Sequence, residues 1–116
     1  MLANIPVTVA KSGTTGDFLV PGGYRLIGFW VPTMDSTTLD LTISDDGGST
    51  FRAVEDTDGT DITGFGGTAD TGAKFVRVPD NLGDLTEGRT CRLTVAAQTT
   101  AARSLIAICR ATGGGG

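Results

Sequence analysis

The chain contains no histidine, and among its 116 residues it has only two cysteines. Histidine is the usual general base near neutral pH and a common zinc ligand, so its absence removes Ser-His-Asp and Cys-His catalysis and most zinc sites. Glycoside hydrolysis needs one carboxylic acid in an apolar pocket and a second at a set separation. The only glutamates, Glu55 and Glu87, lie in polar sequence. We therefore expect no enzymatic activity, no cofactor and no metal.

Clustered positive charge and long apolar runs are also missing. Nine Lys and Arg against thirteen Asp and Glu give a formal net charge of −4, and the cations are scattered, so we expect no nucleic-acid partner. The longest apolar-rich run, YRLIGFWVP at 24–32, is far shorter than the roughly 18 to 20 residues that span a bilayer, so we expect no membrane partner. The N-terminal sequence lacks the features of a signal peptide, which predicts synthesis in a cytoplasm.

What the sequence has in excess is glycine, with 18 residues, together with short segments in which every second residue is apolar. Such alternation predicts strands with one buried face. These segments, separated by turn-forming Gly, Pro and Asp, lie at 5–10, 38–44, 50–54, 73–78, 90–96 and 104–110. The segment 24–31 is nearly continuously apolar instead, as expected for a central strand that is covered on both sides. A weaker strand could include Ile62, and 79–89 could hold one turn of helix. The pattern predicts an all-β protein, an antiparallel β-sandwich or jelly roll with about seven to nine short strands.

The two cysteines fall in the last two predicted strands. If 90–97 and 104–110 pair as a hairpin that turns near Thr100, Cys91 lies opposite Cys109. Opposed cysteines could bridge in an oxidising environment, whereas in a cytoplasm two small buried thiols are expected. The residues alone leave both states open.

The acidic stretch SDDGGSTFRAVEDTDGTD, at 44–61, resembles a calcium loop at first sight. An EF-hand loop ends in a bidentate glutamate at its twelfth position, and counting from Asp56 that position is Gly67. The sequences DDGG and TDGT are typical of tight turns, because Asp and Gly accept positive φ and Asp bonds its own backbone. We expect two turns around a short strand. An incidental cation site at Asp56, Asp58 and Asp61 is the alternative.

Phe29 and Trp30 are consecutive on a predicted strand, so their side chains face opposite sides of the sheet. One enters the core, and the other lies under a neighbouring element or in an interface. An aromatic residue on an exposed sheet face is typical of an assembly contact or a sugar-stacking site. Tyr24 carries a phenol that suits the rim of an interface. The alternative is that all three aromatics belong to the core.

The order of four segments can be compared with that of known proteins: PGGYRLIGFWVP (21–32), LDLTISDDGGSTFRAVEDTDGTDI (39–62), AKFVRV (73–78) and RTCRLTV (89–95). In this order they resemble small virion proteins of tailed bacteriophages, of the capsid decoration or cement type. The resemblance covers roughly residues 20–95 and consists of turn and core patterns. It implies a β-sandwich on the capsid surface, with the major capsid protein as partner and self-association as a homotrimer.

The resemblance also suggests how the chain is divided. We expect residues 1–17 to form an extended arm that could lie across a neighbour, residues 18–111 to form the sandwich, and residues 112–116 to form a flexible glycine tail. The expected interface residues are Ile5, Val7, Val9, Tyr24 and Trp30.

Two other functions stay open at this point. One is a head-fibre or tail-associated module that binds a receptor or glycan, with Trp30 or Tyr24 stacking on sugar. The other is a calcium-dependent, lectin-like domain that uses Asp56, Asp58 and Asp61.

Overall fold

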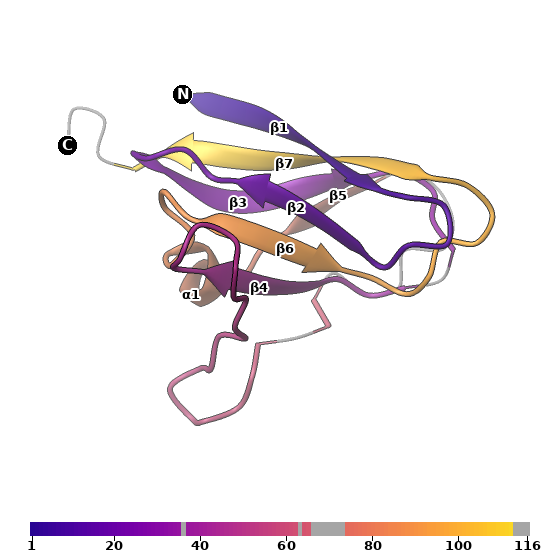
Figure 1. Cartoon of the computed structure of the whole chain (residues 1–116). Helices are drawn as coiled ribbons and strands as arrows, with labels where there is room; N and C mark the ends of the chain where they lie inside the picture. Colours follow the sequence, from indigo (N-terminus) through magenta and orange to yellow (C-terminus); the bar gives the residue numbers. More distant parts are fainter. Residues whose placement is uncertain (36, 63, 66–73, 113–116) are drawn as a thin grey trace.

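The computed structural model describes residues 1–35, 37–62, 64–65 and 74–112, which form two packed antiparallel β-sheets (Figure 1). The four-stranded sheet has the order β1 (Leu2–Val9), β7 (Arg103–Ala111), β3 (Tyr24–Val31), β5 (Lys74–Arg77). The three-stranded sheet has the order β2 (Thr15–Leu19), β6 (Thr90–Thr94), β4 (Asp40–Ser44). A short helix, α1 (Asp80–Gly83), follows β5. The predicted all-β sandwich is confirmed, with seven strands.

One hydrophobic core lies between the two sheets. It is built from the alternate residues of each strand that face inward, as the period of two requires. Phe29 of β3 meets Phe18 of β2 edge to face, with ring centroids 5.7 Å apart, and stacks on Phe65 at 6.5 Å. The contact between Phe18 and Phe29 connects the two sheets. Among the described residues, no helix is long and apolar enough to cross a membrane.

The segment predicted as an N-terminal arm, residues 1–17, is part of the sandwich instead. β1 pairs with β7 over its whole length, and β2 begins at Thr15, so the predicted boundary cuts a strand. Val7 and Val9 are 1% and 0% exposed. The prediction was wrong because alternation in a terminal segment looks the same whether its apolar face packs on its own core or on a neighbour.

At the other end, Thr112 was predicted to begin a flexible tail. Its backbone N–H donates to the carbonyl oxygen of Gly23 at 2.8 Å, so this residue is tied to the turn before β3. The rest of the predicted tail, residues 113–116, lies outside the described residues.

The predicted hairpin between 90–97 and 104–110 is also wrong, because β6 and β7 belong to different sheets. Cys91 and Cys109 nevertheless both face the core, as buried free thiols.

The predicted strand at 50–54 is reduced to an isolated bridge between Arg52 and Ile43. The helical turn expected within 79–89 is present as α1.

Candidate functional site

The two sheets expose outer faces of different chemistry. On the three-stranded sheet, Asp17 of β2 and Arg92 of β6 form a two-point ion pair with N–O distances of 2.8 and 3.0 Å. The guanidinium of Arg92 also lies 4.0 Å from the ring centroid of Phe51. Charged groups on this face therefore satisfy one another across neighbouring strands, as on a sheet surface that faces water.

The outer face of the four-stranded sheet carries its apolar side chains in three of the rows that the strand registers form, and a fourth row, Thr8 and Ser104, is polar. The first row is Phe75, Trp30, Ile106 and Pro6; the second is Arg77, Gly28, Ile108 and Asn4; the third, which β5 does not reach, is Arg25, Arg110 and Leu2. We call these three rows the apolar face. None of its residues carries a carboxylate.

Large side chains on the apolar face remain accessible. Phe75 is 75% exposed and Leu2 is 58% exposed, while Trp30 is half-buried. Nothing in the described part of the chain covers Phe75. Leu2 lies at the opposite corner of the face from Phe75, whereas Phe75, Trp30 and Ile106 adjoin one another in the first row. Adjoining accessible apolar residues mark a contact site, since isolated ones are common.

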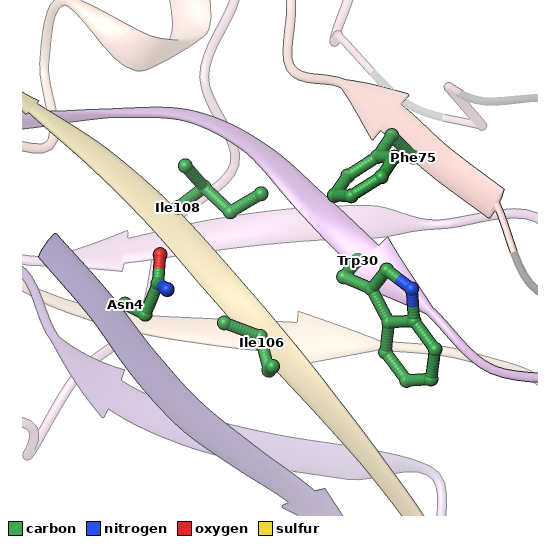
Figure 2. A pocket seen from close by; sticks show the side chains of 5 residues that line it. All are labelled: Asn4, Trp30, Phe75, Ile106 and Ile108. Atoms are coloured by element: carbon green, nitrogen blue, oxygen red, sulfur yellow. The ribbon is translucent and has the colours of Figure 1, made fainter. Parts of the chain in front are cut away.

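The apolar face is hollowed over β7 (Figure 2). The hollow has a volume of about 250 Å³ and is lined by Ile106 and Ile108, with Trp30 and Phe75 on one side and Asn4 on the other. Among these lining residues, the amide of Asn4 and the indole N–H of Trp30 are the only side-chain groups that form hydrogen bonds. The hollow therefore offers a place for an apolar group and little hydrogen bonding.

A smaller hollow of about 140 Å³ adjoins the first, since Phe75 and Ile108 border both. It lies beside Gly28, which has no side chain to fill the space between Arg77 and Ile108. A Cβ on Gly28 would lie 2.7 Å from the carbonyl oxygen of Val76, so the close approach of β3 and β5 requires glycine here.

The third row carries two arginines, and carboxylates from outside the row lie next to them. Arg25 forms ion pairs with Asp84 and, at 3.9 Å, with Asp80. Arg110 lies directly opposite Arg25 and borders a polar hollow together with Asp84 and Glu87. This end of the apolar face therefore presents arginines and carboxylates side by side.

The five predicted interface residues lie in three different places. Trp30 is on the apolar face, and the prediction that one of the Phe29–Trp30 pair enters the core is confirmed, because Phe29 is 0% exposed. Val7 and Val9 are core residues, so their assignment to an interface is corrected. Ile5 and Tyr24 are partly buried and pack against the core.

The principal residue that the sequence analysis missed is Phe75. A usable signal was present in the segment AKFVRV, where alternation places Phe75 and Arg77 on the side opposite Val76 and Val78. The same reasoning that separated Phe29 from Trp30 would have found it. Ile106 and Ile108 were missed because a predicted strand that is apolar on both sides does not indicate which side is exposed.

The acidic stretch forms turns, as expected. Asp46 Oδ1 accepts hydrogen bonds from the Ser44 hydroxyl and from the backbone N–H groups of Ser49 and Thr50, and these bonds hold the Asp46 pKa well below its usual range. The hydroxyl and N–H of Thr60 do the same for the pKa of Asp58. No group of three or more acidic or cysteine side chains among the described residues is arranged to hold a metal ion.

Comparisons with family models, with curated proteins and with solved structures found no match to this chain. A proposal about its function therefore depends on the apolar face and on the order of the segments between residues 20 and 95.

Proposed function

We propose that the protein is a non-enzymatic structural component of a bacteriophage virion, a capsid decoration or cement protein that stabilises the head by binding the major capsid protein. The observation that supports this proposal is the apolar face. An exposed apolar patch on a rigid sandwich is typical of a protein–protein contact. The order of the segments between residues 20 and 95 is the reason for choosing a virion as the setting.

The second candidate is a receptor- or glycan-binding module of the virion, because Trp30 and Phe75 line the same hollow as the amide of Asn4, from the opposite side. Sugar rings do stack on aromatic side chains. A sugar also buries hydroxyl groups, and each buried hydroxyl needs a polar partner. Among the lining residues only the amide of Asn4 and the indole N–H of Trp30 can form hydrogen bonds, so an apolar protein side chain fits the hollow better than a sugar.

The proposal is tested by sedimenting the protein with purified capsids that lack it. We expect saturable binding and a higher temperature of capsid rupture. Phe75→Asp should weaken binding by about tenfold or more, since it removes the most exposed aromatic side chain of the apolar face and puts an unpaired carboxylate into the contact. The matched control is Leu19→Asp, which changes another exposed apolar residue (57%) at the end of β2 in the three-stranded sheet.

Two results would contradict the proposal. One is a wild-type protein that does not bind capsids saturably. The other is tight binding of the isolated protein to a defined glycan on an array, which would favour the receptor-binding candidate.

A further inference from the structure

We propose that a second hollow, between the end of β4 and the segment after α1, binds the C-terminal residue of a protein chain that ends in an apolar side chain. Arg52 and Arg89 receive the terminal carboxylate, and an apolar floor receives the side chain. We call this site the arginine hollow. None of its lining residues belongs to the apolar face, so the inference does not depend on the proposed function.

The arginine hollow lies where the chain leaves β4 and where it passes the same point again after α1 (Figure 1). Its volume is about 170 Å³. At roughly 30 Å³ for each water-sized group, it holds about five or six such groups, the size of a carboxylate together with an isopropyl group. The lining residues are Ile43, Asp45, Arg52, Ala53, Val54, Leu85 and Arg89.

The floor of the arginine hollow is apolar. Ile43 is 8% exposed, and Val54 is partly buried and packs against the core. Leu85 is 46% exposed at the side of the hollow. A small apolar group in the hollow removes part of the Leu85 side chain from water, which favours binding.

The two arginines supply unused positive charge. Neither Arg52 nor Arg89 forms an ion pair within 4 Å among the described residues, although the chain has thirteen acidic residues. The backbone of Arg52 is held by two hydrogen bonds of 2.9 Å with that of Ile43. The guanidinium of Arg89 donates to the carbonyl oxygen of Leu85 at 2.8 Å. A guanidinium has five N–H donors in a planar fork that matches a carboxylate, so donors remain for a ligand.

The remaining charged group distinguishes a chain terminus from other anions. Asp45 borders the hollow but lies more than 4 Å from both guanidiniums. Its carboxylate repels a phosphate, which carries up to two negative charges, and it accepts a hydrogen bond from a peptide N–H. A carboxylate, an apolar side chain and one N–H donor occur together in the last residue of a chain, and capture of such a residue is a known mode of peptide recognition.

Neighbouring charge and the small size of the hollow limit the affinity. The same loop continues through Glu55, Asp56, Asp58 and Asp61, whose negative charge opposes the approach of any anion. Salt at about 0.15 M screens these exposed charges beyond roughly 8 Å. Because a single residue makes the contact, we expect a tripeptide to bind with a Kd of roughly 1 to 30 mM.

Nuclear magnetic resonance of the ¹⁵N-labelled full chain tests the inference. Acetyl-Gly-Gly-Val with a free carboxylate, added up to about 100 mM, should cause saturable shifts at the backbone amides of Arg52, Ala53 and Arg89. The same peptide with a C-terminal amide lacks the charge and should bind about tenfold or more weakly. Acetyl-Val-Gly-Gly keeps the charge but separates it from the side chain, and it should bind about threefold or more weakly.

Three variants connect the binding to the hollow. Arg52→Gln and Arg89→Gln should each weaken binding of acetyl-Gly-Gly-Val by about fivefold or more. Lys11→Gln is the matched control, because it changes the net charge equally at an exposed residue between β1 and β2, outside the hollow. Leu85→Ser should remove most of the preference for acetyl-Gly-Gly-Val over acetyl-Val-Gly-Gly. The same spectra show whether each variant is folded.

Four results would overturn the inference. The first is the absence of saturable shifts up to about 100 mM peptide, a concentration above the expected Kd range. The second is equal binding of the amide. The third is equal binding of the two free-acid peptides, which would reduce the hollow to a site for any anion. The fourth is a double variant Arg52→Gln/Arg89→Gln that binds as the Lys11→Gln control does.

Discussion

At the scale of single residues, α1 is held against β3 by close contacts that involve the backbone of both elements. Thr86 is 0% exposed; its hydroxyl accepts the Leu26 N–H at 2.9 Å and donates to the Gly83 carbonyl at 2.7 Å. This one hydroxyl ties the end of α1 to β3. The contact is tight enough that a Cβ on Gly83 would collide with the carbonyl oxygen of Leu26.

Gly83→Ala should therefore destabilise the protein by about 1 to 3 kcal/mol, because neither backbone can move freely to make room. Gly22→Ala is the matched control, since a Cβ on Gly22 has nothing within 4 Å. Urea unfolding followed by circular dichroism measures both. Equal midpoints for the two variants would show that the contact between α1 and β3 is loose.

Asp46 should make stability depend on pH in the acid range. Its pKa is lowered in the folded protein by the Ser44 hydroxyl and the Thr50 N–H. A lowered pKa means that the stabilisation is fully present above the unfolded-state pKa, about 3.9, and is lost as pH falls below it. Asp46→Asn should lower stability at pH 7 and flatten the fall between about pH 4 and pH 2.

The neighbouring variant Asp45→Asn is the control, because the carboxylate that accepts the hydrogen bonds of Ser44, Ser49 and Thr50 is that of Asp46. Urea midpoints measured from pH 7 to pH 2 compare the two. If Asp46→Asn follows the wild-type curve over that range, these hydrogen bonds do not stabilise the turn.

At the scale of elements, the sequence predicts strands well where the apolar signal is continuous. The run from Tyr24 to Val31 predicts β3 with its observed bounds. β2 was missed because its inward positions include Gly16, which carries no apolar signal, while the apolar Leu19 faces outward. Alternation reports which residues face inward, and it does not report which sheet a strand joins. This is why Cys91 and Cys109 were expected in one hairpin.

The candidate site was likewise predictable only in the part that alternation within one strand reports. Trp30 could be identified because its neighbour Phe29 must face the other way. The apolar face as a whole could not, because its rows combine residues from β1, β3, β5 and β7, and only the registers bring them together. Those registers depend on tertiary pairing of strands that are far apart in the chain.

The place of β1 in the sandwich is tested by two neighbouring variants. Val9 is 0% exposed and Thr8 is exposed, on opposite sides of the strand. Val9→Asp should destabilise by about 3 kcal/mol or more, since it buries a carboxylate without a partner. Thr8→Asp should change stability by less than about 0.5 kcal/mol. Thermal unfolding of both variants measures the difference. Equal and small effects would support the predicted arm and contradict the place of β1 in the sandwich.

At the scale of the whole molecule, one sheet satisfies its charges on its own outer face and the other leaves apolar side chains uncovered. The core between them is complete, with Phe18 and Phe29 in contact across the two layers. No buried polar side-chain atom in the described residues lacks a hydrogen-bond partner. Because Phe75 stays exposed although the core is complete, the apolar face is available for binding.

The shared core also predicts how the whole fold responds to alkaline pH. Cys91 comes from β6 and Cys109 from β7, and both are 0% exposed. Burial raises the pKa of Cys91 to about 12 and that of Cys109 to about 11. Unfolded thiols ionise near pH 8.5 to 9, so a raised folded pKa stabilises the protein below that pH, and the stabilisation is lost as pH rises towards 11.

In reducing buffer, the free energy of unfolding should therefore fall by roughly 2 to 3 kcal/mol more between pH 8 and pH 10 in the wild type than in the double variant Cys91→Ala/Cys109→Ala. Both proteins share every other titrating group, so the difference between the two curves isolates the thiols. The double variant will be less stable at pH 8, because it leaves small cavities, but its curve should be flatter. Parallel curves would mean that water reaches these thiols in the folded state, and that the two sheets do not close over one dry core.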